Sequence, residues 1–283
     1  MRIDVGGAMA CEELSAGLDA RRLVLVGDGA AAIAAAMTLS GAVVGGTMRF
    51  DGHDVATHSH VGKVGLAPSE MPLIPHMTVL HYLAASFELG EVPRATAQQA
   101  AAAALRDAGL GALAGRKTES LALPERKVVL IAQAMAPGLA SLFVETPLAG
   151  LEGPAARYVI DVLERVAQTR RWAATAAHAD AAASERELMM ACDRVAMVGS
   201  GEVEWEGAPS ALMGAGTVYT VGAHGEVDAF RTLLADCGCT VQGAGQRFAV
   251  TVPASGAASQ ILDWATQSGA VVVELVPVLP TGR

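Results

Sequence analysis

The sequence is poor in aromatic and charged side chains, and in lysine above all. Aromatic residues make up 4% of its 283 residues and charged residues 17%, whereas hydrophobic residues make up 52%. Its only lysines are Lys63, Lys117 and Lys127, and the formal net charge is −9. This hydrophobic fraction excludes an intrinsically disordered chain, which combines low hydrophobicity with high net charge. The acidic balance argues against a nucleic-acid partner, because such proteins present a basic face.

Long runs of large apolar residues are also missing. The longest tempting stretch, residues 29–48, carries no charge but consists mostly of Ala, Gly, Thr and Ser. A transmembrane helix needs about 20 predominantly apolar residues, so this stretch predicts a buried helix followed by a turn. No apolar segment follows a basic start at the N-terminus, so no signal peptide is expected. We expect a soluble chain.

Cysteine is scarce for a chain of this length. The four cysteines are Cys11, Cys192, Cys237 and Cys239. They are too few for a disulfide framework, and the pair around Gly238 lacks two further ligands nearby for a metal. We expect reduced cytosolic thiols and no metal site.

Short β-branched runs alternate with helical patterns from residue 22 to residue 206. We expect strands at 22–26, 47–50, 64–66, 142–144 and 173–177, helices at 33–39, 77–90, 95–109, 125–136 and 154–169, and a hairpin at 194–206. Such alternation implies a parallel sheet with crossover helices. Between the first strand and its helix, the segment GDGAAA predicts a glycine-containing loop of the phosphate-binding kind.

A separate pattern follows a linker near residues 212–217. It predicts strands at 217–222, 239–242, 247–252 and 270–276 and helices at 225–236 and 257–268. The order strand, helix, strand, strand, helix, strand is that of a split βαβ, or ferredoxin-like, sandwich.

Six segments in sequence order carry a resemblance to a known family. They read LVGDGAAAIAA, VGLAPSEMPLIPHMTV, ESLALPERKVVLIAQAMA, SLFVETPLAGLEGPAAR, AAHAD and CDRVAMVGSGEVEWEGAPSAL. Together they resemble an ATP-binding-cassette (ABC) ATPase from about residue 12 to residue 213. The tail resembles the small domain that follows the cassette in exporter-type members. The resemblance implies an α/β, P-loop NTPase-like domain over residues 1–213, with a helical subdomain near 70–125, and a small α+β domain over 217–283.

The phosphate loop that the resemblance implies runs from Gly27 to Ala34 and includes Gly29. An active loop reads G-x-x-x-x-G-K-[ST], and its lysine and hydroxyl hold phosphates and Mg²⁺. Here the second glycine falls on Ala32, the lysine on Ile33 and the hydroxyl on Ala34. Charge-assisted hydrogen bonds are worth roughly 1.5–3 kcal/mol each, so losing both groups should weaken nucleotide binding severely.

The remaining nucleotide-binding positions of the family are also altered. The acid pair that supports Mg²⁺ and activates water corresponds to Glu145 and Thr146, and the metal-contacting glutamine corresponds to Ser69. A neutral hydroxyl does not act as a general base at pH 7. His178 stands at the position of the switch histidine, although an ordinary histidine at a strand end is the favoured interpretation. No aromatic residue precedes Phe50 to stack on adenine.

The signature loop, LSGGQ-like in the family, is degenerate as well. Its positions are Leu121, Ala122, Leu123, Pro124 and Glu125. The serine and both glycines are lost, and the proline removes an N–H donor.

Two segments are candidates for contact with partners. Met71, Leu73, Ile74 and Pro75 lie in a proline-rich apolar stretch. In the family this stretch borders the groove that receives a permease helix, and ordinary packing is an equal alternative. Gly150, Leu151 and Glu152 belong to the loop that crosses the subunit interface in cassette dimers. His53, His58 and His60 could bind a metal, but solvent-exposed histidines on a surface hairpin are favoured.

The expected function is that of a catalytically inactive pseudo-ATPase, a subunit of an export-type ABC complex. No cofactor is expected, with ATP and Mg²⁺ bound weakly or not at all. Its partners would be an active ABC ATPase paralogue, a membrane permease or a second copy of itself, which would hold it on the cytoplasmic side of the membrane. In a cassette heterodimer, each ATP site combines the phosphate loop of one subunit with the signature loop of the other. One difficulty is that this chain, with both loops altered, would impair both sites. A protein-interaction scaffold without transport remains an alternative, and an active ATPase with unusual motifs a weaker one.

Overall fold

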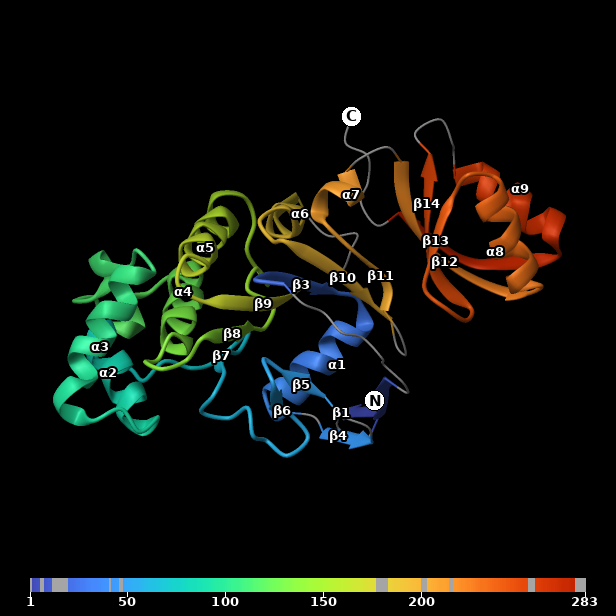
Figure 1. The fold of residues 1–283 in the computed structure, drawn as a ribbon. Coiled ribbons are helices and arrows are strands. Elements are labelled where there is room, and N and C mark those ends of the chain that lie inside the picture. The colour runs from blue at the N-terminus through green and yellow to red at the C-terminus, as the bar shows by residue number, and fades with distance from the viewer. Residues whose placement is uncertain are drawn as a thin grey trace.

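A six-stranded sheet forms the centre of the molecule (Figure 1). The structure, a computed structural model, describes residues 2–5, 8–11, 20–40, 42–45, 48–176, 183–199, 203–213, 216–253 and 258–277. The sheet order is β11-β10-β3-β9-β8-β7. These strands are β3 (Arg22–Val26), β7 (Gly65–Ala67), β8 (Ser141–Val144), β9 (Arg171–Ala176), β10 (Arg194–Val198) and β11 (Val203–Gly207). All neighbours pair in parallel except β11, which is antiparallel to β10. The parallel sheet expected from the sequence is confirmed.

The sheet is covered by helices on both faces. Leu23 and Leu25 of β3 share a buried cluster with α1 (Asp28–Met37), whereas Val24 and Val26 belong to a larger cluster on the other face. This larger cluster includes residues of α4 (Leu123–Ala134), α5 (Gly153–Val166) and α6 (Ala183–Met190). The alternation follows from the two-residue period of a strand, which presents successive side chains to opposite faces.

A helical layer extends the larger cluster away from the sheet. It consists of α2 (Val79–Leu89), α3 (Arg94–Asp107) and the short 3₁₀ helices η1 (Gly111–Leu113) and η2 (Thr118–Ser120). Ala97, Ala101 and Ala104 of α3 are buried at helical spacing. These alanines account for much of the alanine-rich pattern between residues 95 and 109, because small side chains allow close packing.

Small antiparallel pairs lie beside α1. β1 (Arg2–Val5) pairs with β2 (Ala8–Cys11) and β4 (Ala42–Gly45), and β5 (Arg49–Phe50) pairs with β6 (His53–Asp54). The expectation of solvent-exposed histidines in this region is wrong for His60, which is fully buried with Nε2 3.0 Å from the Met37 carbonyl oxygen. The uncharged stretch from residue 29 begins as α1, which ends at Met37. In the described parts of the chain, no helix combines the length and hydropathy required to cross a membrane.

The C-terminal elements form a second unit, which we call the tail (residues 216–277). After α7 (Pro209–Met213) come β12 (Gly216–Gly225), α8 (Val227–Asp236), β13 (Thr240–Gln242), β14 (Arg247–Pro253), α9 (Ala258–Ser268) and β15 (Ala270–Pro277). The strands are antiparallel in the order β13-β14-β12-β15. Phe230 and Phe248 meet edge to face at 6.0 Å in a core between this sheet and its helices.

The other face of the tail sheet lies against the central sheet. Val218 of β12 and Ala249 of β14 belong to the same buried cluster as Trp205 of β11. Gln242 Oε1 accepts a hydrogen bond of 3.4 Å from the backbone N–H of Glu206. The tail therefore docks at the β11 edge, opposite the α2–α3 layer (Figure 1).

Candidate functional site

Polar residues meet where β7, β8 and β9 end. The backbone N–H of Ser69 donates to Glu145 Oε2 at 3.0 Å, and Thr146 Oγ1 donates to Ser69 Oγ at 2.7 Å. The backbone N–H of Thr146 donates to the Thr175 hydroxyl at 3.0 Å. The sequence-predicted residues Ser69, Glu145 and Thr146 are thus brought together. Ligands of open α/β sheets bind at the carboxyl ends of strands, so this is the natural place to look for a site.

Lys127 of α4 completes this group, and the sequence reasoning missed it. Its Nζ donates to the carbonyl oxygens of Ser69 at 2.9 Å and Thr146 at 3.3 Å, and lies 3.4 Å from Ser69 Oγ. The side chain is almost completely buried. Burial lowers the pKa of the Lys127 ammonium below its ordinary value of 10.5, while the charges of Glu70 and Glu145 act in the opposite direction. An ammonium has three donors and no acceptor, so its hydrogen bonds go to oxygens of the chain itself.

We refer to Ser69, Lys127, Glu145, Thr146 and Thr175 as the Lys127 cluster. The sequence did carry a signal for Lys127, because a lysine in a lysine-poor chain stands directly before the apolar run Val128–Ile131. Thr146 has a backbone φ of +36°, a region that side-chain-bearing residues rarely adopt. Its three hydrogen bonds hold it in this strained conformation.

The predicted loop GDGAAA is wrong for residues 28–32, which are helical, whereas the helix predicted from Ile33 is present and begins five residues earlier. α1 begins at Asp28, so only Gly27 separates it from the end of β3. Gly27 has φ +98°, and a Cβ added there would lie 2.7 Å from the Val198 carbonyl oxygen. A Cβ on Gly29 would lie 2.2 Å from the carbonyl oxygen of Gly199. Both glycines therefore allow the start of α1 to approach the backbone after β10.

The residues that the resemblance matches to the lysine of the loop and its neighbours face the protein interior. Ile33 is 7% exposed and lies in the buried cluster that contains Leu25, Met37 and Phe143. Ala32 and Ala34 are buried as well. A residue at position 33 packs α1 onto the sheet.

The segment that the resemblance matches to the signature loop begins α4. Leu121 is buried, Ala122 is the N-cap, and Glu125 Oε2 accepts a hydrogen bond of 2.8 Å from the Ala122 N–H. Pro124 stands in the first turn, where its missing N–H has no helical partner to lose. Leu123 is 43% exposed, and its Cδ2 lies 3.4 Å from where a Cβ on Gly150 would be. The signature segment and the loop at Gly150 are thus side by side at the surface.

Other predicted positions are placed separately. In the stretch from Met71 to Pro75, Ile74 is 52% exposed and Leu73 packs partly against the larger cluster. The Thr118 hydroxyl donates to the Ile74 carbonyl oxygen at 2.6 Å, which fixes this stretch against η2. Leu151 is buried and Glu152 exposed. His178 lies outside the described residues.

Comparison with solved structures identifies the fold. The dimeric structure of MJ0796, a bacterial ABC transporter cassette, aligns with a TM-score of 0.58 and 14% identity over 74% of this chain and 98% of that chain. A dimeric post-hydrolysis state of the ATP-binding cassette MJ0796 bound to ADP and Pi aligns with a TM-score of 0.57 and 16% identity, over 71% and 91% of the two chains. No protein-family model and no curated protein matches the sequence. The chain has the fold of an ABC ATPase cassette.

Proposed function

We propose that the chain is a catalytically inactive ABC-type pseudo-ATPase that serves as a structural or regulatory subunit of a membrane-associated export-type complex. The observation that carries the proposal is the Lys127 ammonium. It bonds Ser69 and Thr146 at the strand ends where the resemblance expects Mg²⁺ and the attacking water. A metal ion would have to share this space with a positive charge, so the residues present do not fit a magnesium nucleotide.

The start of α1 supports the same proposal. In an active loop, glycines let the backbone curl around phosphate. Here α1 begins directly after Gly27, and Ile33 is packed in the core. The N–H groups of the first turn remain a weak anion site, but no cationic side chain reaches them from position 33.

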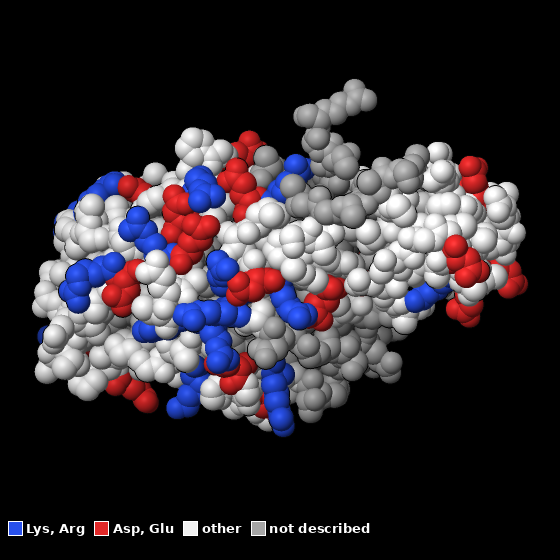
Figure 2. All heavy atoms as spheres, turned by 45° about the horizontal axis from the view of Figure 1, so that its top comes forward, with Lys and Arg blue, Asp and Glu red and all other residues white. Residues whose placement is uncertain are grey.

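Pairing with another cassette is the second part of the proposal. The two solved neighbours are dimers, and the exposed Leu123 beside Gly150 offers an apolar contact where the resemblance places the dimer interface. On the face shown in Figure 2, Lys and Arg are mixed with Asp and Glu over the part of the chain that precedes the tail. This face has no unbroken basic area of the kind that nucleic acid requires. We take the tail as a ferredoxin-like domain appended to this cassette.

The decisive experiment is a titration of the purified chain with a fluorescent ATP analogue, with and without Mg²⁺, followed by a turnover assay. We expect no saturable binding up to about 1 mM, a dissociation constant that corresponds to about −4.1 kcal/mol, and no phosphate release. Micromolar binding with turnover would refute the proposal.

The variant Thr146→Glu sharpens this experiment. It restores the carboxylate that the family uses to activate water, but leaves Lys127 and Ile33 in place. We expect no turnover in this variant either. Turnover in the variant alone would mean that the rest of the site works, and the interpretation of Lys127 as an obstacle would fail.

Pairing with another cassette is tested by analytical sedimentation. The chain is measured alone and then mixed with an intact cassette, if a neighbouring gene encodes one. Leu123→Asp should abolish any association, whereas Leu89→Asp, at an 85% exposed position of α2, should not. No association with intact cassettes would favour the alternative function, a scaffold unconnected with transport.

A further inference from the structure

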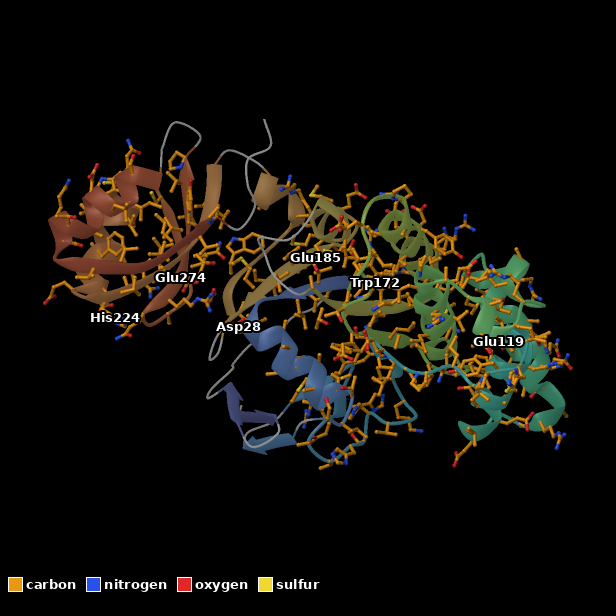
Figure 3. All side chains as sticks on the ribbon, turned by 180° about the vertical axis from the view of Figure 1, so that it is seen from behind. Asp28, Glu119, Trp172, Glu185, His224 and Glu274 are labelled. Atoms are coloured by element: carbon orange, nitrogen blue, oxygen red, sulfur yellow. The ribbon has the colours of Figure 1, made fainter. Side chains whose placement is uncertain are left out.

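Basic side chains lie along the edge of the central sheet opposite the Lys127 cluster. This edge holds the amino ends of the parallel strands, where β3 begins at Arg22 and β9 at Arg171. The two strands are neighbours, and neighbouring strands lie about 4.8 Å apart. Trp172, which Figure 3 labels and which follows Arg171, marks the place of this edge in the molecule. Two charged side chains therefore start from adjacent positions, and both reach solvent, with exposed fractions of 33% for Arg22 and 61% for Arg171.

Two further arginines stand directly before these strands. Arg21 donates from Nε to the Ala167 carbonyl oxygen at 2.9 Å and from Nη2 to the Gln168 carbonyl oxygen at 3.0 Å, just past the end of α5. Arg170 Nη1 donates to the Thr169 carbonyl oxygen at 3.3 Å. Carbonyl groups carry no net charge, so these hydrogen bonds position both guanidiniums without neutralising them.

The basic residues continue towards the β7 end of the sheet. Arg49 begins β5, and Asp51, two residues later, lies 3.2 Å from Arg171 Nη1. Asp54 is the cross-strand neighbour of Arg49. Lys63 stands two residues before β7, which pairs with β8. Arg49 and Lys63 are both exposed. We call the set the basic row: Arg21, Arg22, Arg49, Lys63, Arg170 and Arg171.

Carboxylates neutralise only part of the charge of the basic row. Arg22 is paired with Asp193 at 2.5 Å, and Arg171 with Asp51. Within the described residues, the other four members of the row form no ion pair. The row therefore carries more positive charge than the carboxylates beside it, in a chain whose formal net charge is −9.

Two large apolar side chains are exposed at the same edge. Leu39 is 47% exposed and Val61 is 48% exposed. Because α1 starts at the carboxyl end of β3 and packs along the sheet, its last residue, Met37, lies towards the amino ends. The Met37 carbonyl oxygen is 3.0 Å from Nε2 of the buried His60, which brings Val61 beside the end of α1. Lys63 of the basic row follows two residues later, so apolar and basic side chains share this surface.

We propose that the basic row, with Leu39 and Val61, binds a membrane surface that contains anionic lipids. Attraction to anionic lipids is worth about fivefold in affinity for each Lys or Arg at the surface. Binding at such a surface also grows with the apolar area that is buried among the headgroups. An acidic protein segment would match the charge of the row, whereas a membrane surface also accounts for two separate exposed apolar side chains beside it.

This contact leaves the other surfaces of the molecule accessible. The Lys127 cluster lies at the carboxyl ends of the strands, and Leu123 begins α4 near the same end. The basic row would face the membrane while most of the negative charge points away from it. The inference does not rest on the proposed loss of ATPase activity or on pairing with another cassette, because neither involves the residues of the row.

Sedimentation of the full chain with lipid vesicles tests the proposal. One set of vesicles contains phosphatidylcholine alone, and the other contains phosphatidylcholine and phosphatidylglycerol in equal parts. We expect binding only to the anionic vesicles, and less binding as added salt screens the charges. No binding to anionic vesicles at low salt would overturn the proposal, as would equal binding to both sets. Binding of a soluble polyglutamate peptide without binding of vesicles would assign the surface to an acidic protein instead.

Variants locate the contact. The double variant Arg49→Gln with Lys63→Gln should weaken vesicle binding roughly twentyfold, at about fivefold for each charge. Arg94→Gln with Arg106→Gln is the matched control, because it removes two charges from exposed positions of α3, and it should change binding less than about twofold. Circular dichroism confirms that each variant is folded. Equal weakening by the two pairs would refute the location.

A third variant separates the apolar part of the contact from the charged part. Leu39→Asn removes the apolar side chain and suits the φ of +61° at this position. It should weaken vesicle binding roughly fivefold and leave the salt dependence unchanged. Unaltered binding in Leu39→Asn would remove the argument that favours a membrane over an acidic protein.

Discussion

Two polar regions border the central sheet and differ in how their charges are satisfied. In the Lys127 cluster, the ammonium is surrounded by oxygen acceptors of the same chain. At the tail junction, Arg247 lies beside three carboxylates, and a cavity remains between them. A place at the strand ends therefore does not by itself make a binding site. What distinguishes the two regions is whether the chain fills the space with its own groups.

The largest effect is expected from Ile33→Lys, which restores the lysine of the family motif. Because position 33 lies in the core, the new ammonium would be buried without a partner. We expect a loss of unfolding free energy of about 3–5 kcal/mol, the scale for an unpaired buried charge, measured by urea denaturation. Ile33→Met is the control and should lose less than about 1.5 kcal/mol. A stable Lys variant with gained ATP affinity would contradict the described α1.

The next effect concerns Lys127→Met, which keeps the stem and removes the ammonium. The carbonyl oxygens of Ser69 and Thr146 would lose their donor, at about 1–3 kcal/mol for each unsatisfied buried group. Relief of the buried charge offsets part of this, so we expect a net loss of about 2 kcal/mol in urea denaturation. Lys117→Met removes an ammonium at an exposed position and should cost less than about 0.5 kcal/mol. Similar losses in both variants would mean that burial of Lys127 is unimportant.

The variant Lys127→Met also tests how the stability of the protein depends on pH. The pKa of Lys127 is lowered in the folded protein by burial. Between this lowered pKa and 10.5, the unfolded chain binds more protons than the folded chain, so the stability of the wild type should rise with pH relative to Lys127→Met. Burial raises the pKa of Tyr82, and that of Cys192 to about 12, which gives the opposite trend in both proteins. Only the difference between the two stability curves is diagnostic, and a flat difference up to pH 10.5 would contradict the lowered pKa.

A smaller effect is expected at the junction from Arg247→Met. Glu204, Glu274 and Asp28 would lose their shared cation, and the tail should dock less firmly. Because Arg247 is partly exposed, we expect a loss of about 1 kcal/mol that shrinks with added salt. Scattering of X-rays in solution should show a larger radius of gyration than for the control Arg157→Met, whose ion pairs lie on the surface of α5. An unchanged radius would show that the tail stays docked without the Arg247 cation.

The smallest effect is expected at Thr146, where strain and hydrogen bonding oppose each other. Thr146→Ala loses the hydroxyl bond to Ser69 but keeps the positive φ, and should lose about 1 kcal/mol. Thr146→Gly loses the same bond but relieves the strain, and should lie within about 0.5 kcal/mol of the wild type. Thermal denaturation of the pair measures the difference. Equal losses would mean that the φ of +36° carries no strain.

The sequence predicted the sheet well because each strand carries a short apolar run with turn residues beside it. Residues 22–26 and 194–198 are examples, and the structure has strands at these bounds. It failed at residues 28–32, where alanines favour helix as strongly as the motif favours a loop. Periodicity cannot detect a buried ammonium such as Lys127 or the burial of His60, because both depend on oxygens supplied from distant parts of the chain.

The cation of the Lys127 cluster is covalently part of the chain. An exchangeable metal leaves when its concentration or that of its nucleotide falls, whereas the Lys127 ammonium is present at a constant local concentration. Under the proposed function, this end of the sheet keeps one arrangement while the supply of ATP changes. In an assembly whose other members switch with nucleotide, such a subunit would be the stationary reference against which they move.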